Sequence, residues 1–228
     1  MNTHYSFEKV FANRSRKFHA SENIVSVFNE ICIDKYLNDG VENRSEDISY
    51  KLLLDFLAIN STSQMYMDVG FGVGDNILYQ LKNSDACILG CDPFFNGAIK
   101  LCQYIKVDYL KRVKIVCQPV GFLLSMLPNE VLTKVYVLFP DPWPKKRHNK
   151  RRIFSNEFLS ALTRVIKKDG EVYAATDNFD YACMMQHVIN DSSDFFDAAI
   201  QSYSEDLAQT KYMKKSVNQC YSICTKKI

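Results

Sequence analysis

The sequence lacks the features of secreted, membrane-spanning and repeat proteins. It contains no run of 18 apolar residues, and its first residues do not form the apolar centre of a signal peptide. We therefore expect a cytoplasmic protein that does not span a membrane. No internal repeat or low-complexity tract interrupts the 228 residues, a length that suits one α/β domain with a sizeable core. We predict a basic arm over residues 1–20, which either touches a phosphate backbone or is simply solvated, and a single domain over residues 21–228.

Metal-binding cysteine motifs are also missing. The eight cysteines stand at positions 32, 87, 91, 102, 117, 183, 220 and 224. They form no CxxC pair and show no zinc-ligand spacing, so we predict no metal site. The cysteines at 87, 91, 102 and 117 lie in apolar runs, where a reduced thiol packs as a small hydrophobe. Cys220 and Cys224 are assigned a structural role in preference to a metal.

Basic residues outnumber acidic ones only because of one short stretch. Residues 145–152 hold six basic residues and no acidic one. Without them, 22 basic residues face 26 acidic ones, a balance of −4 against the overall +2. A local positive patch suits a polyanion, although a solvated basic face after a turn is the alternative.

A proline-rich loop precedes this patch. The apolar run 135–138 predicts a buried strand, and it continues into Phe139-Pro140-Asp141-Pro142-Trp143-Pro144. Residues that precede proline are pushed out of the α region, so we predict an extended, stiff loop. Extended geometry places alternate side chains on one side. Asp141 and the chain's only tryptophan, Trp143, are therefore predicted to face a common, base-sized space.

From residue 65 the sequence alternates strand, turn and helix, which predicts a parallel sheet covered by helices. The strand 65–69 is followed by Gly70, Gly72 and Gly74, which allow a sharp turn and a close approach to a ligand. The dinucleotide pattern would need a glycine where Asp75 stands. The loop is therefore predicted to hold a smaller nucleoside cofactor.

Polar residues follow the later strands. Asp92 ends the strand 86–91 and suits the two hydroxyls of a ribose, with a helix N-cap as its alternative role. Gln118 follows the strand 113–117 and is assigned to an adenine edge. Asp177 follows the strand 171–175, where it either joins Asp141 at the carboxyl edge of the sheet or caps the next helix.

Helices are predicted from Ser21, from Ser45, and over residues 158–166, with the last one closed by Asp169-Gly170. A further helix runs to Asn190. The polar residues from 38 onward predict a loop, and residues 196–201 and 220–225 are the weaker strand candidates.

Together these segments resemble bacterial tRNA (guanine-N7-)-methyltransferases over residues 65 to 182. The resemblance rests on Asp68-Val-Gly-Phe-Gly, Asp92, FPDPW at 139–143, the KxRHNKRR block that begins at Lys145, and Ala175-Thr-Asp177. It implies a Rossmann-like seven-stranded α/β methyltransferase fold, S-adenosylmethionine as the methyl donor, and a guanine of the tRNA variable loop as the acceptor.

The resemblance also implies residue roles. The cofactor-binding set is Asp68, Gly70, Gly72, Gly74, Asp92, Gln118 and Asp141, with Asp141 also the catalytic residue. The substrate-binding set is Lys145, Asp177, Thr210, Lys211 and Tyr212. The RNA-binding set is Lys145, Lys146, Arg147, His148, Asn149, Lys150, Arg151 and Arg152. A monomer or a homodimer is expected.

Four positions depart from the family pattern. Aspartate stands at Asp68 and Asp92 where the family usually has glutamate, Pro119 replaces an acidic residue, and Met213 replaces the glutamate of the late TK[FY]E loop. Two other functions therefore stay open at this point. One is an RNA-binding protein of this fold that has lost catalysis, and the other is a methyltransferase acting on a small molecule or a protein. The basic octet 145–152 disfavours the latter.

Overall fold

The computed structural model describes residues 21–37, 41–202, 208, 210 and 220–228. The predicted basic arm therefore lies outside the described residues. The chain groups into two compact units, the first from Met1–Ser63 and Phe71–Met126, the second from Gln64–Gly70 and Leu127–Ile228. The prediction of a single domain from residue 21 stays a prediction. Within the described ranges, no helix has both the length and the apolar character needed to traverse a bilayer.

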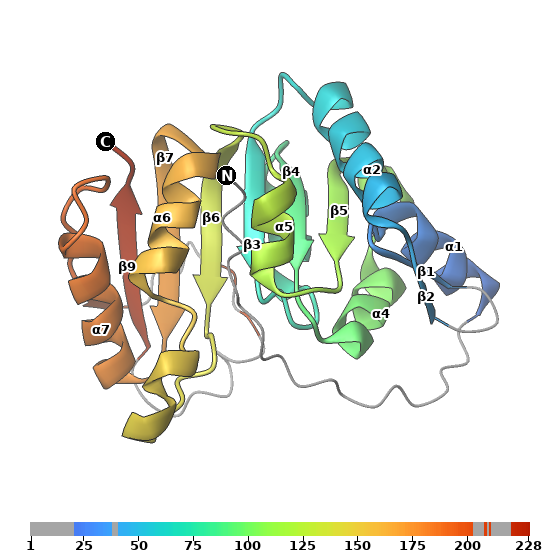
Figure 1. The fold of residues 1–228 in the computed structure, drawn as a ribbon. Coiled ribbons are helices and arrows are strands. Elements are labelled where there is room, and N and C mark those ends of the chain that lie inside the picture. The colour runs from blue at the N-terminus through green and yellow to red at the C-terminus, as the bar shows by residue number, and fades with distance from the viewer. Residues whose placement is uncertain (1–20, 38–40, 203–207, 209, 211–219) are drawn as a thin grey trace. The chain divides into compact units, whose positions relative to one another are not determined.

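Helices and strands alternate along the chain (Figure 1). The first unit contains α1 (Glu22–Ile31), β1 (Lys35–Leu37), β2 (Val41–Asn43), α2 (Glu46–Ile59), α3 (Asp75–Asn83), β4 (Cys87–Cys91), α4 (Phe95–Tyr104), the 3₁₀ helix η1 (Val107–Arg112), β5 (Val113–Val116) and α5 (Val120–Met126). The second contains β3 (Met65–Val69), β6 (Leu132–Leu138), the 3₁₀ helix η2 (Lys146–Arg151), α6 (Asn156–Val165), β7 (Ile166–Thr176), α7 (Phe179–Asn190), β8 (Gln201–Ser202) and β9 (Tyr221–Lys226).

Seven strands form one mostly parallel sheet, in the order β5-β4-β3-β6-β7-β9-β8. In the first unit β4 runs parallel to β5. In the second, β3, β6 and β7 are parallel, whereas β9 is antiparallel to β7 and β8. All residues of β3 and β4 are buried, as expected of parallel strands covered on both faces. The predicted seven-stranded α/β fold is confirmed.

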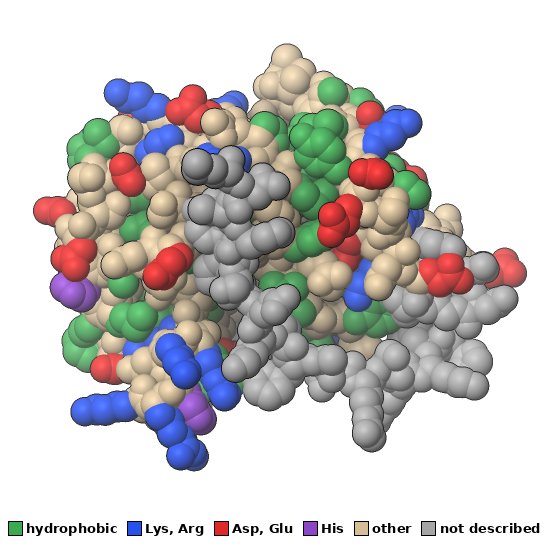
Figure 2. Space-filling view, viewed as in Figure 1, with side chains coloured by type: hydrophobic (Ala, Val, Ile, Leu, Met, Phe, Trp, Pro, Cys, Tyr) green, Lys and Arg blue, Asp and Glu red, His purple; other side chains and the backbone are tan. Residues whose placement is uncertain are grey.

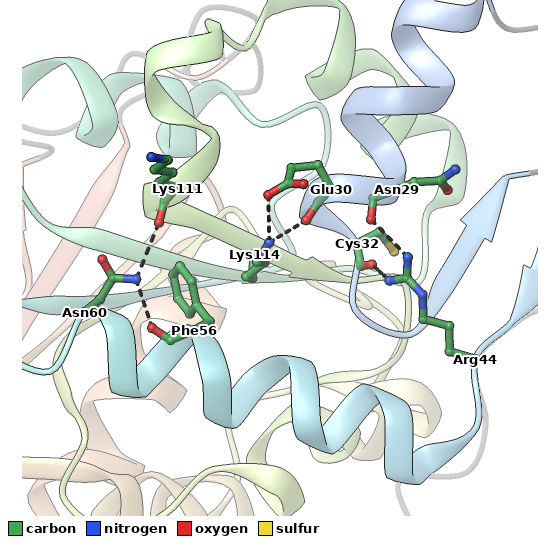
Figure 3. A network of polar contacts seen from close by, with 8 residues as sticks. All are labelled: Asn29, Glu30, Cys32, Arg44, Phe56, Asn60, Lys111 and Lys114. Atoms are coloured by element: carbon green, nitrogen blue, oxygen red, sulfur yellow. Dashed lines mark hydrogen bonds and ion pairs between the residues drawn. The ribbon is translucent and has the colours of Figure 1, made fainter.

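In the first unit, α1 contacts both α4 and β5. The rings of Phe28 in α1 and Phe95 in α4 meet edge to face, with centroids 5.5 Å apart. The ammonium group of Lys114 in β5 donates to the Glu30 carbonyl and pairs with its carboxylate at 3.6 Å (Figure 3). Residues 38–40 of the predicted loop lie outside the described residues. After them the loop prediction is wrong, because β2 pairs with β1 in antiparallel orientation.

In the second unit, α6 and α7 lie side by side over β7 and β9 (Figure 1). The prediction that α6 extends to Ile166 and is closed by Asp169-Gly170 is wrong. The helix ends at Val165, and Ile166 instead pairs with Leu132 of β6 as the start of β7. Asp169, with a φ of 61°, lies within this strand near a register shift, so its turn-like backbone belongs to a strand irregularity. The strand predicted over 196–201 is reduced to β8.

Candidate active site

In the first unit, the Asp92 carboxylate holds the glycine-rich loop. Its Oδ2 accepts a hydrogen bond from the Gly72 amide at 2.7 Å, and its Oδ1 accepts one from the Phe94 amide at 2.7 Å. Phe94 is the residue that precedes the first turn of α4, so the alternative role of Asp92 as the N-cap is wrong. The half-buried Asp92 side chain therefore ties the glycine-rich loop to the start of α4.

Gly97 in α4 allows this loop to sit against the helix, and sequence reasoning missed it. A Cβ atom at this position would lie 1.9 Å from the carbonyl oxygen of Gly72. No side chain fits there without moving the backbone. Gly72 itself has a φ of 57°, a conformation that glycine adopts without steric cost. The only available sequence signal was a glycine in the first turn of the helix that follows Asp92.

Gln118 and Asp92 follow two paired strands, β5 and β4, at the carboxyl edge of the first unit. The Asp92 amide donates to the Val116 carbonyl at 3.1 Å, which continues the pairing of β4 with β5 beyond the strand end. Gln118 follows two residues later, half-buried and just before α5. The structure thus brings together two of the residues assigned to the cofactor.

The second unit places two exposed carboxylates just beyond adjacent strand ends. Leu138 of β6 pairs with Ala175 of β7, and the Phe139 amide donates to the Ala175 carbonyl at 2.7 Å. Asp141 and Asp177, both exposed, follow these two strands. The alternative role of Asp177 as a helix cap is wrong, because the Asn178 side chain accepts from the Tyr181 amide instead.

Asp68 and Gly70 also belong to the second unit. Asp68 is buried in β3, with Tyr136 of β6 as its cross-strand partner. Gly70 follows the strand, is exposed and has a φ of 73°. A buried carboxylate one residue before the end of a strand is expensive to desolvate, which is typical of a position kept for a function or for a local polar contact.

The backbone of the proline-rich loop differs from the extended form that was predicted. Phe139 and Trp143 have φ values of 53° and 42°, in the left-handed region that bulky residues rarely adopt. Proline does keep both residues out of the right-handed α region, but the chain turns instead of extending. The predicted extended backbone is therefore wrong at these two residues, and a common side for Asp141 and Trp143 no longer follows from alternation. Strained backbone of this kind is found where a loop must hold a defined shape.

The basic segment forms an exposed surface at η2. Figure 2 shows Lys and Arg side chains gathered beside a histidine at the lower left of the view. We define the basic surface as the exposed residues Lys145, Lys146, Arg147, Lys150 and Arg151. The Arg151 guanidinium carbon lies 4.8 Å from the centre of the Trp143 ring, and the His148 ring meets the same indole edge to face. His148 and Asn149 are only half-buried.

Arg152 does not belong to the basic surface, contrary to the prediction. Its side chain is 2% exposed. Its Nε donates to the Pro142 carbonyl at 2.7 Å, Nη2 pairs with Asp180 at 2.9 Å, and its guanidinium lies over the Tyr181 ring. Arg152 thus supports the proline-rich loop from within. Nothing in the sequence of the basic run distinguished the buried Arg152 from its exposed neighbours.

Tyr181 connects this support to the catalytic candidate. Burial raises the pKa of Tyr181 to about 12, and the nearby charge of Asp141 acts in the same direction. The phenol therefore stays protonated, and its oxygen accepts from the Phe154 amide at 3.4 Å. Asp141 lies close to this buried ring while remaining exposed itself.

The predicted late substrate loop is described at one position only. Thr210 is buried, and its amide donates to the Ala208 carbonyl at 2.8 Å. Lys211, Tyr212 and the departing residue Met213 lie outside the described residues.

Comparisons with known proteins identify the family. A family described as putative methyltransferase matches residues 62–224. A tRNA (guanine-N(7)-)-methyltransferase of Wolbachia pipientis wMel is 34% identical over 151 residues, which span 66% of this chain and 64% of that protein. A protein of the same name from Caulobacter vibrioides is 34% identical over 161 residues, which span 68% of this chain and 71% of the relative.

Solved structures share the fold. A 30S ribosomal A1408 methyltransferase from an uncultured bacterium aligns with a TM-score of 0.60 at 12% identity, over 85% of this chain and 99% of that one. An antibiotic-related methyltransferase aligns with a TM-score of 0.58 at 17% identity, over 81% and 96% of the two chains. Both are methyltransferases by name, and at such identities they show the fold alone. The sequence matches, together with the proline-rich loop and the two strand-end carboxylates, establish that this chain belongs to the tRNA (guanine-N(7)-)-methyltransferase family.

Proposed function

We propose that this protein transfers a methyl group from S-adenosylmethionine to N7 of a guanine in the variable loop of tRNA. Family membership supports the reaction and the methyl donor. The observation that carries the substrate class is the basic surface beside the proline-rich loop. Five exposed cations on one short segment suit a nucleic-acid backbone and have no use with a small neutral substrate.

The first unit fits the nucleoside part of the cofactor. Asp92 follows β4 and contacts the glycine-rich loop, and a carboxylate there suits the two ribose hydroxyls because its oxygens accept hydrogen bonds. The glycine loop presents backbone in place of side chains, and Gln118 has an amide that can pair with an adenine edge. Asp68 and Gly70, which belong to the second unit, remain proposed cofactor contacts.

The second unit fits the guanine. Guanine carries donors at N1 and at its exocyclic amine, and Asp141 and Asp177 are exposed acceptors beyond neighbouring strands. Adenine has an acceptor at N1 and would leave a carboxylate unpaired, so it should be rejected. The fixed position of Asp141 follows from Arg152, which holds the carbonyl of the next residue, Pro142.

The basic surface is assigned to the tRNA backbone, with Lys145 nearest to Asp141 in the chain. His148 and Asn149 are assigned to RNA less directly, because both are half-buried. Arg151 stacks on Trp143, which pre-orders its guanidinium for a phosphate. Thr210, Lys211 and Tyr212 remain proposed substrate contacts.

The residues of this chain act by alignment and electrostatics. S-adenosylmethionine supplies an electrophilic methyl group on a sulfonium. Guanine N7 has a lone pair and carries no proton, so no side chain needs to remove one before attack. Asp141 is assigned the role of holding the base in line, which contributes several kcal/mol by proximity. Its negative charge also favours the positive charge that develops on the methylated ring.

The shorter carboxylates at Asp68 and Asp92 keep the charge of the usual glutamates, and Asp92 demonstrably reaches the glycine loop. We therefore propose an active enzyme, acting in the cytoplasm as a monomer or homodimer. The test is mass spectrometry of nucleosides from unmodified tRNA incubated with the protein and methyl-labelled S-adenosylmethionine. Labelled 7-methylguanosine is expected. Labelled nucleosides of another kind, or tRNA binding without any methylation, would contradict the proposal.

A further inference from the structure

Three metal-ligating side chains meet inside the first unit, and none of them is assigned to the cofactor, although Cys117 directly precedes Gln118. Cys32 follows α1, Asp34 lies two residues further on, and Cys117 follows β5. All three are buried, at 1%, 3% and 3% exposure. One ligand atom from each lies within 4.8 Å of the other two. Cys32 and Cys117 are separated by 85 residues in the chain, so no spacing rule could join them.

One carboxylate oxygen in this cluster has no hydrogen-bond partner within the described part of the chain. Asp34 Oδ1 accepts from the Cys117 amide at 2.9 Å and from the Cys32 thiol at 3.2 Å. Asp34 Oδ2 is fully buried and, among the described residues, no group donates a hydrogen bond to it. Leaving a charged oxygen buried and unpaired is costly. A cation bound between the carboxylate and the two sulfurs would remove that cost.

The distances fit a tetrahedral ion better than a disulfide. The Sγ atoms of Cys32 and Cys117 are 3.9 Å apart, whereas a disulfide bond measures about 2.05 Å. Zinc–sulfur bonds of about 2.3 Å in a tetrahedron place two sulfurs about 3.8 Å apart. With a zinc–oxygen bond of about 2.0 Å, a sulfur and an oxygen come about 3.5 Å apart, and the three ligand atoms of this cluster all lie within 4.8 Å of one another.

The surrounding backbone is held in place without a metal. The Cys32 amide donates to the Phe28 carbonyl at 2.8 Å, and the Ile33 amide donates to the Ile115 carbonyl at 3.0 Å. Arg44 donates to the carbonyls of Cys32 and Asn29, as Figure 3 shows. Such outer contacts orient the first ligands of a metal site.

We propose that Cys32, Asp34 and Cys117 bind one zinc ion, with a fourth ligand from outside the protein. Two thiolates and one carboxylate favour zinc over magnesium or calcium, which take oxygen ligands. Binding converts the two thiols to thiolates and releases two protons. The ion clamps the segment after α1 to the end of β5, one residue before Gln118. Cysteine spacing led us to predict no metal site. The proposed site differs from that prediction because the fold brings together ligands that are far apart in the sequence.

The experiment uses the full-length chain without S-adenosylmethionine or tRNA, so its result is independent of the proposed function. Protein purified under reducing conditions is stripped with a chelator, reloaded with zinc and analysed by elemental mass spectrometry. One zinc per chain is expected, with a rise in the melting temperature on reloading. Cobalt loading should add an absorption band for thiolate-to-cobalt charge transfer, which reports sulfur ligation directly.

Variants separate these ligands from other thiols. Cys32→Ser, Cys117→Ser and Asp34→Asn should each weaken zinc binding by more than the roughly 10- to 100-fold that loss of an outer-shell contact costs. Cys87→Ala is the matched control, since Cys87 is a buried free cysteine of the same unit outside the cluster, and it should bind zinc like wild type.

Several results would overturn the proposal. Wild-type protein that takes up less than about 0.1 zinc per chain, or that binds cobalt without the charge-transfer band, has no such site. Unchanged affinity in both serine variants would place the metal elsewhere. A disulfide between Cys32 and Cys117, found by mass spectrometry in protein kept under reducing conditions, would show a redox pair in its place. If a variant does not fold, the wild-type stoichiometry and cobalt spectrum still decide the question.

Discussion

Nη2 of Arg152 lies 2.9 Å from Oδ2 of Asp180, and the two partners differ sharply in exposure, at 2% and 79%. The arginine charge is therefore neutralised at the protein surface while its guanidinium stays inside. The same group donates to the Pro142 carbonyl at 2.7 Å, so it fixes the residue that follows Asp141. A cation in the middle of a basic run thus has a structural role, whereas its neighbour Arg151 is exposed.

Replacing Arg152 with alanine should destabilise the protein by about 2–4 kcal/mol, because the Pro142 carbonyl loses a charge-assisted hydrogen bond and the Tyr181 ring loses its packing partner. Urea unfolding measures the change. Asp180→Asn should cost only about 0–1 kcal/mol, since that carboxylate is exposed and screened. Arg151→Ala is the matched control and should stay within about 0.5 kcal/mol of wild type. A stable Arg152→Ala protein with weakened tRNA binding would return Arg152 to the RNA-binding set.

Asp92→Ala should have two effects, because this carboxylate contacts the loop as well as the proposed ribose. S-adenosylmethionine binding should weaken by about 1.5–3 kcal/mol, the range for hydrogen bonds to a charged group. The cofactor-free protein should also lose about 1–2 kcal/mol of stability, since the Gly72 and Phe94 amides lose their acceptor. Calorimetry and urea unfolding measure the two. Asp108→Ala, which removes an exposed carboxylate of the same unit, should change neither. An unchanged dissociation constant for Asp92→Ala would reject the ribose role.

Alanine at Lys145, Arg147, Lys150 and Arg151 should weaken tRNA binding and leave cofactor binding intact, because these side chains are exposed on the basic surface. Each lost phosphate contact should flatten the log–log dependence of affinity on salt by roughly 0.7–0.9. Filter binding from low to moderate salt gives the slope. A control with alanine at Lys167 and Lys168, exposed cations of β7, should keep the wild-type slope. If the quadruple variant also keeps it, the cluster is only a solvated face.

Much of the fold could be predicted from local pattern, because buried parallel strands are short apolar runs bounded by polar turns. The strands at 65–69 and 87–91 are examples. The end of α6 could not be predicted, since Ile166 continues the apolar period of the helix but is taken by sheet pairing with Leu132. Pairing between distant residues overrides local preference in such cases.

The sequence nominated the residues of the candidate site, but it did not predict the backbone of the proline-rich loop or the burial of Arg152. The sequence predicted Asp141 and Asp177 at neighbouring strand ends, and they do follow the adjacent strands β6 and β7. The steric effect of proline excluded one backbone region for Phe139 and Trp143 but did not choose between the two that remained. Burial of Arg152 depends on its contact with Asp180, which lies 28 residues away, and nothing in the basic run announces that contact.

The last prediction concerns the chemical step. If Asp141 only holds the guanine and stabilises its developing charge, no proton leaves in the transition state, because N7 carries none. The single-turnover rate should then be flat between pH 6 and 9. Inosine at the target keeps N7 but lacks the exocyclic amine, so it should lose roughly 1.5–3 kcal/mol, or about 10- to 100-fold in rate. Asp141→Asn should cost more, since it removes the charge as well as one acceptor.

Single-turnover methylation of guanosine- and inosine-substituted tRNA, with wild type and Asp141→Asn over this pH range, tests these expectations. Asp177→Asn is the companion variant, because Asp177 occupies the corresponding exposed position after the adjacent strand. If Asp177 accepts from the exocyclic amine, its variant should lose activity on guanosine but little more on inosine, since the amine is already absent. A wild-type rate that rises about tenfold per pH unit, with the rise abolished in Asp141→Asn, is the behaviour of a general base. That result would contradict the proposed mechanism of alignment and electrostatics and would show that Asp141 removes a proton.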